Sequence, residues 1–94
     1  MPVPPYDYVL ERCIQLVAKA RRMPPESITA ESSFEGLGVD SLDLINLSFE
    51  VEERFNVEIP DDALSSIRTV GDMARGVLVL LEAKAGAEPQ RESA

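Results

Sequence analysis

One stretch organises this sequence: Leu37-Gly38-Val39-Asp40-Ser41-Leu42-Asp43-Leu44-Ile45, which runs on to Phe55. Within it, a glycine-containing loop passes into a helix that we expect to span residues 41–55. Asp40 is a good N-cap residue, and Asp43 stands three positions later, where its carboxylate can act as a capping-box partner. Ser41 lies at the junction between the loop and the helix, so the role of this serine is the main question that the sequence poses.

The predicted helix has two apolar sides when its residues are placed at about 100° per step. The side that we expect to face the core carries Leu44, Leu47, Val51 and Phe55, with Ser48 at its edge. Roughly opposite lies a second apolar set, called the outer strip below, which consists of Leu42, Ile45 and Phe49. Polar residues flank the outer strip, namely Asp43, Asn46, Glu50 and Glu53.

The composition limits the classes of protein to which the chain can belong. Its 94 residues suffice for one small domain, and 17 acidic against 9 basic residues give a formal net charge of −8. This balance argues against nucleic acid and anionic membrane surfaces as partners, and it favours proteins with basic surfaces. The N-terminus lacks the layout of a signal peptide, and no apolar run approaches the ~18 residues of a spanning helix. We therefore expect a cytoplasmic monomer.

A first helix is predicted to begin at Tyr6 or Asp7, because apolar residues recur from there at spacings of three and four. Pro24-Pro25 is expected to stop this helix. The helix carries the single cysteine, Cys13, which cannot form an internal disulfide and therefore fits a reducing compartment. Its apolar neighbours predict a buried structural thiol. Residues 1–5 are proline-rich, and we expect them to be extended.

Residues 23–40 form a long connection that we expect to be ordered. Its apolar residues are spaced to pin it onto the core, namely Ile28, Phe34, Leu37 and Val39. A single helical turn is expected to begin at Ser27 or Thr29. Gly36 and Gly38 permit backbone angles that other residues avoid, just before the helix that follows Asp40.

Two further helices complete the predicted fold. A short one is expected to be capped by Asp61 or Asp62. Thr69-Val70-Gly71-Asp72 has capping-box spacing for a last helix, and the small, polar residues 86–94 are expected to form a disordered tail. No segment shows useful strand alternation. The predicted fold class is therefore all-α, a small four-helix bundle of three longer helices and one short third helix.

We do not expect catalytic chemistry within the chain. A serine nucleophile needs a base, most often histidine, and the sequence contains no histidine. The glycines of a nucleophile elbow are replaced around Ser41 by Val39 and Asp43. The Cys and His set of a zinc site is missing, and the acidic residues do not follow the EF-hand pattern. Neither an active site nor a dedicated metal site is predicted.

The sequence leaves two explanations open for Ser41. A serine near the start of a helix is commonly a local cap. Alternatively, the free N–H groups and the positive dipole end of a helix favour an attached phosphate. Asp40 and Asp43 oppose such a phosphate electrostatically. A phosphodiester at Ser41 must therefore be installed by an enzyme, for which these acids would act as recognition groups.

Two explanations are also open for the outer strip. Monomeric proteins normally keep such residues away from solvent, so an apolar row bordered by carboxylates indicates a binding surface. The competing explanation is that the short third helix and the long connection cover the strip, which would make it part of the core.

Residues 37–43 resemble the signature of acyl carrier proteins, in which a glycine, any residue and Asp-Ser-Leu mark the attachment serine. Other landmarks resemble this family in the same order and at suitable spacing: Pro25-Glu26-Ser27-Ile28, Ser33-Phe34, Glu52-Glu53-Arg54-Phe55, Glu58-Ile59-Pro60-Asp61 and Thr69-Val70-Gly71-Asp72. The resemblance covers roughly residues 6 to 84, most of the segment 6–85 that we predict to be the carrier domain.

The resemblance implies a four-helix carrier whose Ser41 holds phosphopantetheine through a phosphodiester. A phosphopantetheinyl transferase using coenzyme A would attach this arm, and its thiol would carry acyl groups to synthases, reductases, transferases or ligases. The imported sulfur explains why no catalytic base is needed. Partners in this family offer basic docking patches, for which the expected contacts are Asp40, Leu42, Asp43, Ile45, Phe49, Glu50 and Glu53.

Three departures from the family pattern leave the pathway open, and one of them is the hydroxyl that Ser48 places at the edge of the core face. Asn46 stands where many fatty-acid carriers have an acid, and Phe49 stands where a flexible Met is frequent. Fatty-acid, polyketide and specialised lipid pathways all fit. Peptidyl or aminoacyl carriers usually lack an acid directly before the serine, so Asp40 makes that class a secondary alternative. An unmodified helical adaptor that uses the outer strip is another.

Overall fold

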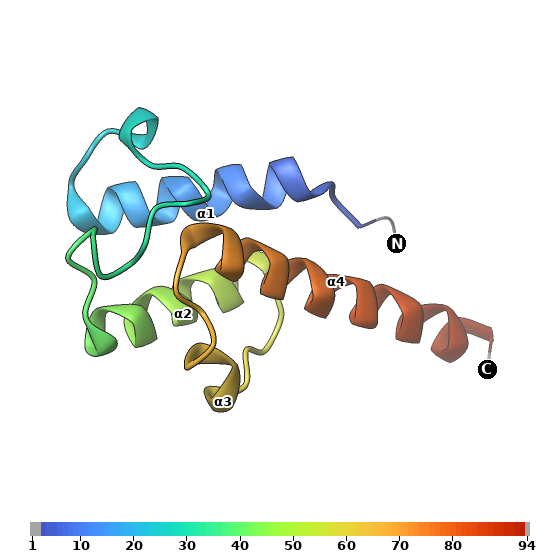
Figure 1. Ribbon diagram of the computed structural model, residues 1–94. Helices are drawn as coiled ribbons and strands as arrows, with labels where there is room; N and C mark the ends of the chain where they lie inside the picture. The colour runs from blue at the N-terminus through green and yellow to red at the C-terminus, as the bar shows by residue number, and fades with distance from the viewer. Residues whose placement is uncertain (1–2, 94) are drawn as a thin grey trace.

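The computed structural model describes the backbone of residues 3–93 and the side chains of residues 3–86. It contains the helices α1 (Tyr6–Arg21), α2 (Ser41–Phe55), α3 (Asp61–Leu64) and α4 (Val70–Ser93), and one 3₁₀ turn, η1 (Pro25–Ser27). Within the described residues there is no strand, only an isolated bridge between Ser33 and Thr69. The all-α prediction, with a short third helix, is confirmed (Figure 1).

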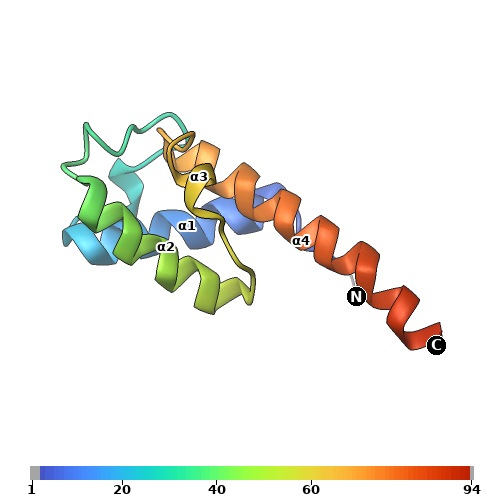
Figure 2. The ribbon, with the colours of Figure 1, turned by 90° about the horizontal axis from the view of Figure 1, so that it is seen from below.

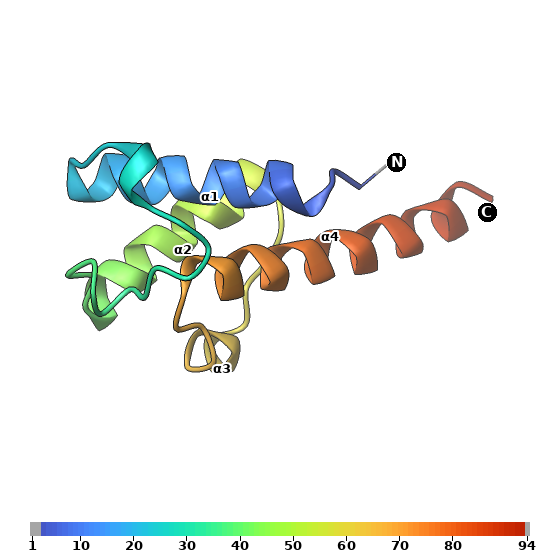
Figure 3. The same ribbon diagram turned by 45° about the horizontal axis from the view of Figure 1, so that its top comes forward.

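Helix α1 packs against both α2 and α4, and both of these helices run antiparallel to it (Figures 1 and 3). Helix α3 lies to one side of α4, within the connection that joins α2 to α4. In Figure 2, the view from below, the C-terminal turns of α4 continue past the other helices. Helices α1 and α2 are therefore antiparallel, and α4 closes the core.

The core is formed by small and medium-sized apolar side chains from three helices. Those with an exposed fraction of 1% or less are Val9, Cys13, Val17, Val51, Val70, Met73, Ala74 and Val77. Burial raises the pKa of the Cys13 thiol to about 12. A thiol with such a pKa stays protonated and unreactive at neutral pH, as expected for a structural cysteine.

Helix α1 ends at Arg21, shortly before Pro24-Pro25. Arg22 adopts the left-handed conformation with φ 55°, and the N–H of Met23 donates to the Ala18 carbonyl at 3.0 Å. This is a helix C-cap built without glycine. Pro24 follows this cap by two residues, the usual place for a proline that cannot continue a helix, so the prediction that the helix stops at Pro24-Pro25 is confirmed.

The long connection is ordered, as predicted, because Ile28, Phe34 and Val39 are buried in the core. Its helical turn differs from the prediction: η1 begins at Pro25, where a fixed φ and a missing N–H suit the first position of a helix. Ser27 ends the turn, and its Oγ donates to the Pro24 carbonyl at 2.7 Å.

The helices α3 and α4 begin in different ways. No side chain caps α3: Pro60 precedes it and Asp61 is already helical, so the prediction of an Asp61 or Asp62 cap is wrong. The capping box of α4 is confirmed. Thr69 Oγ1 accepts from the Asp72 N–H at 3.1 Å, and Asp72 Oδ2 accepts from the Thr69 N–H at 3.2 Å.

The predicted carrier domain, 6–85, is flanked by two short segments, 1–5 and 86–94, which the structure describes in part. Pro5 is extended, with φ −69° and ψ 160°, whereas residues 1–2 of the predicted extended segment lie outside the described residues. The backbone of α4 continues through most of the segment 86–94, for which the sequence predicts a disordered tail. The side chains from residue 87 onward lie outside the described part, and the tail stays a prediction.

We expect Asp72→Asn to lower stability at neutral pH by roughly 0.5–1 kcal/mol, because a carboxylate in the first turn of a helix is favourable. Hydrogen bonds to the carboxylate, chiefly from the Arg68 N–H, lower the pKa of Asp72 below its ordinary value of 3.8. This stabilisation is present above pH 3.8 and is lost as the pH falls through the lowered pKa.

Urea unfolding of both proteins from pH 7 to about pH 3 measures this effect, since linkage predicts that the difference shrinks toward acid. A difference in unfolding free energy that stays constant over this range would contradict the prediction.

Candidate functional site

Ser41 is the first residue of α2, and its side chain is exposed. The cap is supplied by Asp40, whose Oδ1 accepts from the Asp43 N–H at 2.8 Å while its backbone is extended, with φ −86° and ψ −175°. Within the described residues, no hydrogen bond engages the Ser41 hydroxyl. The explanation of Ser41 as a local helix cap is therefore excluded, because the neighbouring Asp40 caps the helix.

The Asp43 side chain does not complete the capping box that the sequence predicts. Its Oδ2 lies 3.9 Å from Nη1 of Arg21, at the end of α1, in an exposed ion pair. The carboxylate therefore joins α2 to α1, whereas the predicted reciprocal bond would have returned it to the N–H of Asp40.

Arg21 is a residue of the site that sequence reasoning missed. Its Nε donates to the Leu37 carbonyl at 3.1 Å, 16 residues along the chain, so one guanidinium holds both the loop before Ser41 and the first turn after it. The sequence shows Arg21 only as a basic residue late in a helix, which the helix dipole already explains.

Gly38 fits closely beneath this guanidinium. Its φ is +79°, in the region that favours glycine, and a Cβ at this position would lie 2.9 Å from Nη2 of Arg21. Any side chain at Gly38 would therefore meet both an unfavourable backbone conformation and the arginine. Gly38 lets the chain turn sharply against α1 just before it enters α2.

The outer strip of α2 is exposed to solvent. Leu42 is 65% exposed, Phe49 59% and Ile45 40%. The competing explanation, in which the long connection and α3 cover the strip, is excluded. Ser48 differs from the prediction, because it is buried and lies inside the core face: its Oγ donates to the Ile45 carbonyl at 2.6 Å, which satisfies the hydroxyl within the helix.

A groove of about 410 Å³ lies between α2 and α3, and Ser41 stands in its wall. We call it the serine groove. Its other lining residues are Leu44, Ile45, Ser48, Phe49, Glu52, Ile59, Asp61, Leu64 and Ser65. Two residues of the outer strip, Ile45 and Phe49, therefore also border a partly apolar space that begins at the serine.

Two acidic residues of α2, Glu50 and Glu53, lie outside the serine groove. Glu50 and Glu53 are exposed, and together with Lys19 and Arg54 they line a shallow depression beside α1. The structure therefore places these two acids near two of the chain's own cations, which the sequence pattern did not show. Asp40 and Asp43 remain close to the serine, at the start of the helix.

Comparisons with known proteins agree with this geometry. Residues 11–77 match the family model described as a phosphopantetheine attachment site. An acyl carrier protein of Phenylobacterium zucineum is 46% identical over 68 residues, which cover 71% of this chain and 86% of that protein. The acyl carrier protein of Caulobacter vibrioides is 44% identical, with 71% and 87% covered.

This chain belongs to the acyl carrier protein family. Among solved structures, the acyl carrier protein of Thermotoga maritima has a TM-score of 0.73 at 28% identity, covering 83% of this chain and 92% of that one. The Enterococcus faecalis acyl carrier protein shares the fold, with a TM-score of 0.69 at 20% identity. The protein is accordingly a phosphopantetheine-dependent acyl carrier that other biosynthetic enzymes and a transferase act upon, and it is not itself an enzyme.

The residues at the start of α2 suit a phosphopantetheine group. The exposed hydroxyl of Ser41 can be reached by a transferase, and the free N–H groups of the helix end favour the phosphodiester. Phosphopantetheine supplies the thiol that forms thioesters. The chain supplies the attachment point and an adjacent groove with apolar walls. Among the described residues, no set of three or more His, Cys, Asp or Glu side chains could hold a metal ion.

The same described part of the chain contains no helix with the length and apolar character needed to cross a membrane.

We expect Arg21→Met to loosen the loop before Ser41. Loss of the bond to Leu37, about 1 kcal/mol, should speed amide hydrogen exchange at Gly38 and Val39 by about fivefold. The matched control is Arg22→Met, which removes the same charge from an exposed neighbour whose side chain makes no hydrogen bond within the described residues. Equal exchange rates in the two variants would contradict a specific role for Arg21.

Proposed function

We propose that Ser41 is the residue that carries phosphopantetheine in this acyl carrier protein. The observation that supports this most directly is the division of roles at the start of α2: Asp40 caps the helix and leaves the Ser41 hydroxyl exposed and unbonded within the described residues. The carrier would hold acyl intermediates as thioesters on that arm.

We further propose that partner enzymes dock on α2 around Ser41. The outer strip of Leu42, Ile45 and Phe49 would supply the apolar contact, because more than a third of each side chain is exposed. Asp40, Asp43, Glu50 and Glu53 would supply the charge that attracts basic patches. Such a surface speeds encounter while leaving release easy, which suits a carrier that visits several enzymes in turn.

The same proposal covers the biosynthetic pathway that the carrier serves and its location in the cell. Fatty-acid synthesis is the typical role of the family, and the polar Asn46 and aromatic Phe49 on the docking helix also fit a polyketide or specialised lipid pathway. The net charge of −8 would keep the protein soluble and favour a monomer that moves between enzymes in the cytoplasm.

Incubation with coenzyme A and a broad-specificity phosphopantetheinyl transferase tests the attachment site. We expect the mass of the protein to rise by one phosphopantetheinyl group, and we expect Ser41→Ala to abolish the gain. Ser48→Ala is the matched control, since the buried Ser48 hydroxyl is bonded inside the helix and should not affect the mass gain. A gain that persists in Ser41→Ala would contradict the assignment.

Charge reversal on α2 tests the docking surface. We expect the double variant Glu50→Lys, Glu53→Lys to lower the kcat/KM of modification by about tenfold at low ionic strength, and by less as salt screens the attraction. The control is Glu26→Lys, Glu31→Lys, which makes the same change in net charge on the exposed part of the long connection. Equal losses in both variants would mean that net charge alone matters and that α2 holds no docking site.

A further inference from the structure

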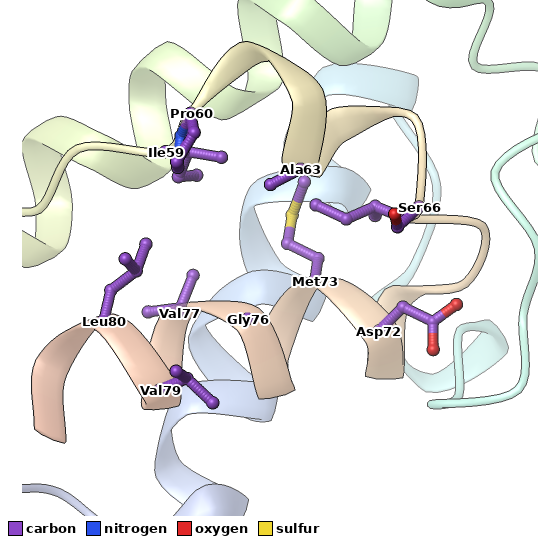
Figure 4. A pocket seen from close by; sticks show the side chains of 11 residues that line it. Ile59, Pro60, Ala63, Ser66, Asp72, Met73, Gly76, Val77, Val79 and Leu80 are labelled. Carbon is purple, nitrogen blue, oxygen red and sulfur yellow. The ribbon is translucent and has the colours of Figure 1, made fainter. Parts of the chain in front are cut away.

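Helix α2 has two flanks of different chemistry. The flank toward α3 borders the serine groove, and a second groove of about 400 Å³ lies between α3 and α4. Figure 4 shows that apolar side chains form most of this second groove, with the Asp72 carboxylate near one end. The flank toward α1 is charged instead, and we call it the α1–α2 seam. Its charged residues are Lys19, Arg21, Asp43, Glu50, Glu53 and Arg54.

Two depressions follow the α1–α2 seam, and Glu50 lines both of them. The first, of about 200 Å³, has Asp43 in its wall, in the first turn of α2 and two residues after Ser41. The second, of about 350 Å³, continues from Glu50 to Lys19 and Arg54. The seam is therefore continuous with the surface around Ser41 on which we propose that partner enzymes dock.

The fold does not explain why Lys19 and Arg54 come together. Each lies in the last turn of its helix, where the helix dipole favours a base. The dipole does not require that the two bases meet in one depression. All four charged side chains of this depression are exposed, and the ion pairs found within residues 3–86 include neither Lys19 nor Arg54. The two cations are thus available to a partner.

The charges in the second depression have opposite effects on a basic partner. Glu50 and Glu53 attract it, whereas Lys19 and Arg54, which line the same depression, repel it. Discrimination between partners commonly uses such a repulsive element together with an attractive one. A partner gains from all four charges only when its own docking patch carries carboxylates as well as bases.

We propose that Lys19 and Arg54 select the enzymes that dock on α2. They repel a docking patch that carries only bases, and they attract the carboxylates of a patch that carries both charges. The partner that fits is an enzyme whose bases face Glu50 and Glu53 and whose carboxylates face Lys19 and Arg54. This inference rests on the proposed docking of partners on α2, and it adds the end of α1 to that surface.

Modification kinetics test the repulsion. The probe is a phosphopantetheinyl transferase chosen for a docking face that carries bases and no carboxylate. We expect the double variant Lys19→Gln, Arg54→Gln to raise kcat/KM by about fivefold at low ionic strength, and by less as salt screens the charges. The matched control is Arg68→Gln, Arg75→Gln, which makes the same change in net charge on exposed residues outside the seam and should stay near the wild-type value.

An equal rise in both double variants would mean that net charge alone acts, and it would overturn the proposal. No rise, or a loss, in Lys19→Gln, Arg54→Gln would overturn it as well. A wild-type protein that accepts no arm at Ser41 would instead contradict the proposed function, so the two failures are distinguishable.

Peptide binding tests the preference for mixed charge. Decalysine and a peptide in which single glutamates separate pairs of lysines would be titrated into the protein, with the amide NMR signals of Glu50 and Glu53 reporting the Kd of each. We expect Lys19→Gln, Arg54→Gln to shift the ratio of the two Kd values about fivefold toward decalysine, and the control to keep the wild-type ratio. A ratio that does not change would overturn the proposal.

Discussion

The hydrogen bond from the Asp43 N–H to the Asp40 carboxylate fixes where α2 begins, and much of the molecule depends on that starting point. Because the helix starts at Ser41, Leu47 and Val51 turn into the core while Leu42 and Phe49 turn out. A shift of one residue rotates every side chain of a helix by about 100°, which would bury the wrong side. Because Asp40 makes this bond, Ser41 is not needed as a cap and its hydroxyl stays available for modification. One interaction therefore serves both folding and function.

The loop that delivers the chain to this point is held from outside α2. Arg21 bonds the Leu37 carbonyl and lies beside Asp43, and Gly38 takes the conformation that brings the loop under the guanidinium. An exposed ion pair such as Arg21–Asp43 contributes little to stability. The hydrogen bond from Arg21 to the Leu37 carbonyl is therefore the stronger of the two interactions. The result is a serine on a firmly positioned turn that still faces solvent, as a modification site requires.

Local patterns in the sequence predicted most of the fold. The spacing of apolar residues located α1, α2 and α4, and the capping residues located the starts of α2 and α4 correctly. The predictions failed where the outcome depends on residues far apart in sequence. The contact between Arg21 and Leu37 crosses 16 residues, and the two grooves exist only once α3 packs beside α2 and α4. The left-handed end of α1 at Arg22 and the uncapped start of α3 lack the residues that normally signal them.

The central claim is that the Asp40 cap leaves Ser41 free to carry the arm, and its most direct test is made on protein purified from its own source. Trypsin should release residues 23–54 as one peptide, which contains Ser27, Ser32, Ser33, Ser41 and Ser48. Fragmentation of this peptide in a mass spectrometer locates the modified residue. The account predicts phosphopantetheine, free or acylated, on Ser41 and on none of the other four serines. A peptide modified at another serine, or one found only without the arm, would contradict it.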